Sequence, residues 1–126
     1  GAIELVDAVR RAGVPTALVS SSYRVLVDAA LDTLGRDRFD VTVAGDEVGA
    51  GKPDPEPYLA ACERLGVKPA DAVVLEDAIS GVRSAEAAGC VAVAVPWIGS
   101  IEATPRRPVL ASLTEIKVDW LLSLLG

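Results

Sequence analysis

Short apolar runs alternate with longer amphipathic segments along most of this sequence. The short runs are apolar at nearly every position, and we interpret them as buried strands at residues 16–20, 41–44, 73–75 and 91–95, with a further short strand expected near residues 109–110. The longer segments carry apolar residues at helical spacing and predict helices at about residues 2–12, 24–34, 58–65, 82–89 and 118–125. Buried strands separated by helices form parallel sheets. The pattern therefore predicts a doubly wound α/β fold, with helices on both faces of a parallel sheet.

The composition suggests one globular domain that binds neither nucleic acid nor a membrane. The 126 residues are 51% hydrophobic and 24% charged, which provides enough apolar surface for a single core. No apolar run approaches the roughly 20 residues that cross a bilayer, and no signal peptide is recognisable. The formal net charge of -6 argues against binding to the phosphate backbone of DNA or RNA.

The histidine and cysteine content excludes several kinds of catalytic and metal site. The chain has no histidine, which excludes Ser-His-Asp and Cys-His nucleophile systems and histidine-ligated zinc sites. Cys62 and Cys90 lie far apart in the sequence, each among small apolar residues, as buried reduced thiols do. We therefore expect a cytoplasmic protein whose chemistry depends on carboxylates, lysine or hydroxyl groups.

Polar side chains follow three of the predicted strands. Ser20 and Ser21 end the first strand, Lys52 lies in the Gly/Pro-rich loop after the second, and Glu76 and Asp77 end the third. Because the carboxyl ends of parallel strands meet at one edge of a sheet, we expect these groups to share a crevice. A hydroxyl, an ammonium and two carboxylates suit a phosphoryl group together with Mg²⁺.

Each of these signals has a simpler interpretation when it is taken alone. The serines are suited to capping the helix that follows them, and Lys52 to being a solvated surface lysine in a turn. Glu76 and Asp77 are suited to capping the next helix and to interacting with its dipole. Their common position at one sheet edge favours a shared site over three separate local roles.

Two further features carry no functional prediction. Gly51 and Lys52 resemble the end of a nucleotide-binding P-loop, but Asp46 and Pro53 stand where that motif needs glycine and Ser or Thr. The larger aromatic residues are expected to be packing residues: Tyr23, Tyr58, Trp97 and Trp120.

Three stretches, in this order, resemble motifs of the haloacid dehalogenase superfamily. They are residues 17–22 (ALVSSS), 51–58 (GKPDPEPY) and 74–82 (VLEDAISGV). The resemblance covers residues 1–100 and is to phosphatases of the type related to β-phosphoglucomutase. It implies a Rossmann-like core domain of that superfamily.

The same resemblance implies roles for the polar residues at the sheet edge. Ser20 and Lys52 would be catalytic, because Ser20 would hydrogen-bond the phosphoryl group and Lys52 would neutralise the nucleophile and the transferring phosphoryl group. Ser21, in the same serine cluster, would be a further phosphate ligand. Asp77 and Glu76 would hold the cofactor Mg²⁺.

One motif of the family is absent from the sequence. Relatives carry Asp-x-Asp-Gly-Thr at the end of an N-terminal strand, and no Asp-x-Asp occurs here. By the resemblance, that strand lies at the centre of the sheet, between the strands at residues 16–20 and 73–75. We therefore expect residues 1–126 to be the carboxyl-terminal part of a core domain, inactive alone, that needs an N-terminal portion of the same protein to complete its sheet. The helical cap of the family is also missing.

The resemblance implies a Mg²⁺-dependent phosphohydrolase that acts on a small phosphorylated metabolite. The reaction would pass through an aspartyl-phosphate on an aspartate outside this sequence. A sugar-phosphate mutase of the same family is one alternative, and a non-catalytic pseudoenzyme or a receiver-like phosphate-binding module is another. Chain order argues against a receiver domain, because receivers place their acid pair before the Lys-Pro, whereas here Lys52 precedes Glu76.

Overall fold

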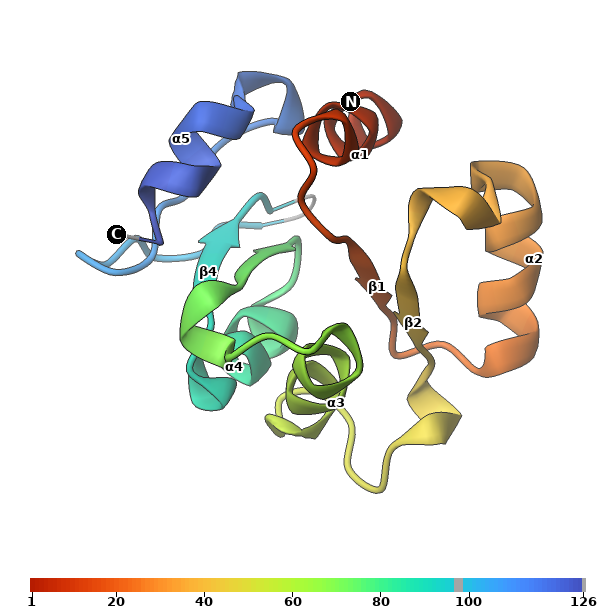
Figure 1. The fold of residues 1–126 in the computed structure, drawn as a ribbon. Coiled ribbons are helices and arrows are strands. Elements are labelled where there is room, and N and C mark those ends of the chain that lie inside the picture. The colour runs from red at the N-terminus through yellow and green to blue at the C-terminus, as the bar shows by residue number, and fades with distance from the viewer. Residues whose placement is uncertain (97–98, 126) are drawn as a thin grey trace.

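The chain folds into alternating helices and short parallel strands. The structure is a computed structural model, and it describes residues 1–96 and 99–125. The main elements are α1 (Ala2–Arg11), β1 (Ala17–Val19), α2 (Arg24–Leu34), β2 (Val41–Val43), α3 (Glu56–Leu65), β3 (Val73–Glu76), α4 (Ile79–Ala88), β4 (Val91–Ala94) and α5 (Val118–Ser123). Their order confirms the predicted α/β alternation (Figure 1). Trp97 lies outside the described residues.

The element predictions differ from the structure in detail. The expected strand at residues 109–110 is a single parallel bridge between Val109 and Ala94. It forms through hydrogen bonds on both sides of Ala94, whose N–H donates to Pro108 O and whose carbonyl accepts from Leu110 N. Helix α3 begins at Glu56, two residues before the expected position, because proline is well tolerated in the first turn of a helix.

The strands form two separate parallel pairs. β1 pairs with β2 in the register Ala17 to Val41, and β3 pairs with β4 in the register Val73 to Val91. Within residues 1–96 and 99–125, no ladder joins β1 to β3. In this chain, therefore, β1 and β3 are each paired along one edge only.

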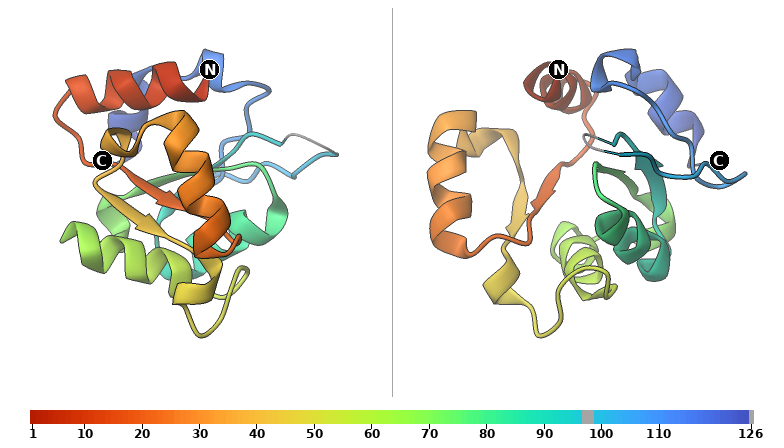
Figure 2. Two further views of the ribbon diagram at one scale, coloured as in Figure 1. Left: turned by 90° about the vertical axis from the view of Figure 1, so that its right-hand side faces the viewer. Right: turned by 180° about the vertical axis from the view of Figure 1, so that it is seen from behind.

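Helices cover both faces of the β3–β4 pair, as the pattern predicts (Figure 2). Val74 and Ala92 face a core that α3 and α4 complete, whereas Val73 and Leu75 face a second cluster built by α1 and α5. A third cluster joins α2 to the other strand pair; its members are Leu18, Val27, Leu31, Phe39 and Ala44. No helix of the described residues has the length and apolar character needed to cross a bilayer.

Two glycines allow the backbone to approach the predicted site closely. A Cβ atom at Gly81 of α4 would lie 2.0 Å from the carboxyl carbon of Glu76. A Cβ atom at Gly45 would lie 2.1 Å from the carbonyl oxygen of Ser21, and the Gly45 N–H donates to Ser22 O at 2.7 Å. The missing side chains thus let α4 pack against Glu76 and let the loop after β2 pack against the serines.

Helix α4 also anchors the loop that carries Lys52. Ser84 is fully buried, and its hydroxyl donates a hydrogen bond to the carbonyl of Asp54 at 2.6 Å. Glu56 holds the start of the same loop, because its carboxylate accepts from the N–H of Ala50 at 3.1 Å. The loop is therefore held at both ends, with Lys52 between the two anchors.

Gly81→Ala is expected to destabilise the protein. The added methyl group must displace either Glu76 or α4, and overpacking of this kind costs about 1–3 kcal/mol of the free energy of unfolding. Chemical denaturation measures the change. Gly51→Ala is the control, because a Cβ atom at Gly51 meets nothing within 4 Å. Equal effects of the two substitutions would contradict this account of α4 packing.

Candidate functional site

Lys52 connects the carboxyl ends of β1 and β3. Its Nζ donates to the carbonyl of Val19 at 3.1 Å and forms an ion pair with Glu76 Oε1. The Lys52 side chain is only 10% exposed, so the interpretation as a solvated surface lysine is wrong. Ser20 follows Val19 and Asp77 follows Glu76 in the sequence. The Lys52 contacts thus bring the backbone that carries the serines and the acid pair to one edge.

The serine loop is not the cap of the next helix. The residue before α2 is Tyr23, whose side chain makes no capping hydrogen bond. Instead, Asp46 from the loop after β2 accepts a hydrogen bond from the N–H of Arg24 at 2.8 Å. Ser20 Oγ accepts from the N–H of Ser22 at 3.1 Å, which orders the turn at the end of β1. Ser21 is exposed at that turn.

The acid pair also has no capping role. The residue before α4 is Ala78, and among the residues that the structure describes no side chain caps this helix. Glu76 is buried, with 8% of its side chain exposed, whereas Asp77 is exposed. The two neighbouring carboxylates therefore occupy different environments, with Glu76 inside the protein and Asp77 at the surface.

Tyr58 is the second partner of the Glu76 carboxylate. Its hydroxyl donates a hydrogen bond to Glu76 Oε1, the oxygen that also receives Lys52. The Lys52 ammonium lies 5.2 Å from the centre of the Tyr58 ring, within the range of a cation–π interaction. Burial, together with the neighbouring Glu76 charge, raises the pKa of Tyr58 above its usual value, which keeps the phenol protonated and able to donate.

The aromatic residues differ from their expected packing roles. Tyr58 is buried as expected, but its hydroxyl also belongs to a polar cluster that consists of Lys52, Glu76 and Tyr58. A buried tyrosine hydroxyl usually has a hydrogen-bond partner. A tyrosine predicted to pack in the core therefore already indicates that a polar group lies beside it. Tyr23 is 66% exposed and does not pack in the core, whereas Trp120 packs against the cluster between α1 and α5.

The carboxylates suit a divalent cation that has other ligands as well. Within the described part of the chain, Glu76 Oε2 accepts no hydrogen bond. Asp77, the next residue in the sequence, is exposed. The described residues contain no group of three or more His, Cys, Asp or Glu that can hold a metal. Mg²⁺ commonly takes one or two protein carboxylates and completes its shell with water and phosphate oxygens. The donor set fits such a site.

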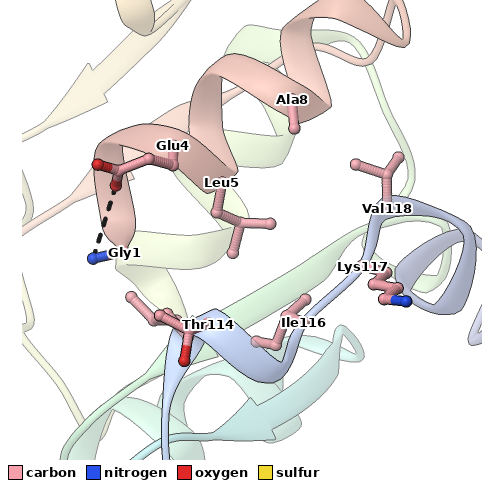
Figure 3. A pocket seen from close by; sticks show the side chains of 9 residues that line it. Gly1, Glu4, Leu5, Ala8, Thr114, Ile116, Lys117 and Val118 are labelled. Carbon is pink, nitrogen blue, oxygen red and sulfur yellow. Dashed lines mark ion pairs between the residues drawn. The ribbon is translucent and has the colours of Figure 1, made fainter.

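A cavity of about 560 Å³ lies elsewhere, between α1 and the segment before α5 (Figure 3). Leu5 faces Ile116 and Val118 across it, and Glu4 pairs with the Gly1 amino group at its rim at 3.6 Å. None of the residues that line this cavity belongs to the Lys52 cluster or follows the end of a strand. It is therefore separate from the site predicted at the sheet edge.

The sequence and the fold both match known proteins. The family described as "Hydrolase: haloacid dehalogenase-like hydrolase" matches residues 1–89. The chain is 40% identical over 119 residues to validoxylamine A 7'-phosphate phosphatase of Streptomyces hygroscopicus subsp. limoneus, covering 93% of this chain and 56% of that protein. It is 44% identical over 122 residues to β-phosphoglucomutase of Mycobacterium bovis, covering 94% of this chain and 45% of that protein.

A solved structure of a related protein has a similar fold. The crystal structure of CbbY from Rhodobacter sphaeroides in complex with phosphate superimposes with a TM-score of 0.81 at 34% identity, covering 89% of this chain and 52% of that one. The chain thus spans about half the length of the relatives it matches. The family match over residues 1–89, supported by these relatives, shows that the chain belongs to the haloacid dehalogenase-like hydrolases.

Proposed function

We propose that residues 1–126 are the carboxyl-terminal part of the core domain of a Mg²⁺-dependent phosphohydrolase that acts on a small phosphorylated metabolite. The observation that carries this proposal is the position of Lys52, whose ammonium contacts the ends of both β1 and β3. Ser20 and Asp77 are the next residues after those contacts. A cation between a hydroxyl-bearing turn and an acid pair suits a phosphoryl group.

The proposed roles follow from this arrangement. Ser20 and Ser21 donate hydrogen bonds to phosphoryl oxygens, and Lys52 balances the negative charge of the nucleophile and of the transferring group. Asp77 and Glu76 hold Mg²⁺, which supplies further positive charge when bound. The nucleophile is an aspartate outside residues 1–126. Its carboxylate attacks phosphorus as the P–O bond to the metabolite breaks and the metabolite's oxygen leaves. Water then hydrolyses the aspartyl-phosphate and releases inorganic phosphate.

A missing central strand is the structural part of the proposal. β1 pairs only with β2 and β3 only with β4 in the described chain, and the relatives are about twice as long. Each backbone group left buried without a partner costs about 1–3 kcal/mol. We place an additional strand, from an N-terminal portion of the protein, between β1 and β3. This strand would bring the nucleophilic aspartate to the edge that holds Lys52, and without it the 126-residue chain is expected to be inactive.

Cysteine chemistry supports a reducing, cytoplasmic location within the same proposal. Cys62 and Cys90 are buried free thiols whose sulfur atoms lie 3.9 Å apart. Burial, with the neighbouring Cys62, raises the pKa of Cys90 to about 12, so its thiol stays protonated near neutral pH. A reducing compartment keeps such thiols reduced, which agrees with the location that we propose.

A mutase is the second candidate, because one relative of similar coverage is a β-phosphoglucomutase. The two activities differ in the fate of the phosphoryl group, which a phosphatase releases to water and a mutase returns to the sugar. Measuring inorganic phosphate and the isomeric sugar phosphate in one reaction separates them. Free phosphate as the main product supports the phosphohydrolase.

The first prediction of the proposed function concerns the missing strand. The chain is extended at its N-terminus with the residues that precede the matched region in validoxylamine A 7'-phosphate phosphatase. We expect amide hydrogen exchange in β1 and β3 to slow about tenfold or more, because a strand between them would pair their free edges. Exchange in α2 is the control for general stabilisation. Equal slowing of α2, or no slowing of β1 and β3, would count against the strand.

The second prediction concerns the metal site. In the extended chain, Asp77→Asn is expected to reduce Mg²⁺-dependent phosphate release by about 100-fold or more, because it removes a charged ligand at the reacting group. Asp71→Asn is the matched control, since Asp71 is an exposed acid in the turn before β3. A phosphate-release assay against a panel of sugar phosphates measures both variants. Unchanged turnover in Asp77→Asn would refute the assignment.

A further inference from the structure

The polar cluster contains a buried group to which the proposed reaction assigns no role. Tyr58 is 6% exposed and lies in the first turn of α3, away from the serine turn and from Asp77 in the sequence. Its hydroxyl reaches Glu76 Oε1, and its ring lies beneath the Lys52 ammonium. Tyr58 therefore contacts both members of the buried ion pair.

We propose that Tyr58 is a positioning residue that orients the Glu76 carboxylate and, through it, holds the Lys52 ammonium at the edge shared by β1 and β3. Its value for catalysis rests on the proposed function. The positioning itself is a property of this chain's geometry and is tested separately below.

The Glu76 side chain is confined by close neighbours. Gly81 of α4 lies so close that even a Cβ atom would overlap the Glu76 carboxylate. The Tyr58 hydroxyl and the Lys52 ammonium in turn share one carboxylate oxygen, Oε1. A buried carboxylate depends on such donors, because it has lost its contacts with water. The phenol is the rigid one of the two donors, since its ring packs in the core between α3 and α4.

Lys52 needs this support because its own side chain is flexible. A lysine has four methylene groups and a rotating ammonium, so it does not take a single position unless its partners define one. Its ammonium has three N–H groups, and the carbonyl of Val19 and Glu76 account for two of them. Within residues 1–96 and 99–125 the Lys52 ammonium donates no other hydrogen bond. A shift of Glu76 would redirect all three.

The experiment measures the accessibility of each lysine. The chain contains Lys52, Lys68 and Lys117, and the last two are exposed. The chain with the N-terminal extension described above is treated with a limiting amine acetylating reagent, and the acetylation rate at each lysine is read by mass spectrometry. Tyr58→Phe removes only the hydroxyl, and Tyr23→Phe is the matched control at an exposed tyrosine.

We expect Lys52 to react more slowly than the other two lysines in the unchanged chain. Tyr58→Phe should raise its rate about three- to tenfold, the change that loss of one hydrogen bond produces in an equilibrium, and should leave Lys68 and Lys117 unchanged. Tyr58→Leu, which also removes the ring, should raise the Lys52 rate at least as much. Tyr23→Phe should change none of the three.

Several outcomes would overturn the inference. One is an unchanged Lys52 rate in Tyr58→Phe. Another is an equal rise at all three lysines, which would indicate general loosening instead of positioning. A third is a Lys52 rate as high as that of Lys68 in the unchanged chain, because the buried pair would then be absent.

A phosphate arm separates this inference from the proposed function. Inorganic phosphate added to the unchanged chain should slow acetylation of Lys52 alone if this edge binds a phosphoryl group. Failure of that protection, with the Tyr58→Phe effect intact, would contradict the phosphate site and leave the positioning role standing. Protection of Lys52 by phosphate, with no effect of Tyr58→Phe, would support the phosphate site and overturn the positioning role.

Discussion

The buried ion pair between Lys52 and Glu76 is the interaction on which the arrangement of this chain depends. It joins the end of β3 to the loop before α3 and, through the carbonyl of Val19, to the end of β1. Removing one partner of such a pair leaves an uncompensated buried charge, which costs about 3–5 kcal/mol. The two separate strand pairs are thus held at a common edge by side-chain contacts, although in the part of the chain that the structure describes no backbone ladder connects them.

Small and buried polar residues around the pair make room for it. Gly81 lets α4 approach the Glu76 carboxylate, and Ser84 on the same helix holds the loop that presents Lys52. Gly45 lets the loop after β2 approach the serine turn at residues 20–22. These residues contribute little apolar area, and their identity is set by the space and the hydrogen bonds that the charged cluster requires.

Membership of the haloacid dehalogenase-like hydrolases gives this arrangement its context. The chain matches about half of its relatives' length and carries a hydroxyl-rich turn, a cation and an acid pair. Charge neutralisation and positioning account for most of the catalysis of phosphoryl transfer, and this chain contains groups suited to those tasks. A central strand between β1 and β3 stays a prediction from the resemblance.

The sequence alone determined the order of helices and strands, the parallel pairing and the positions of Ser20, Lys52 and Asp77 after strand ends. Apolar periodicity is a local property, and parallel strands place their carboxyl ends together whatever the other contacts are. Only the tertiary structure decided that Lys52 pairs with Glu76 with 10% of its side chain exposed, that Tyr58 binds Glu76 and that Asp46 caps α2. Each of these joins residues about 20 or more positions apart, and such contacts depend on packing distances that no local pattern contains.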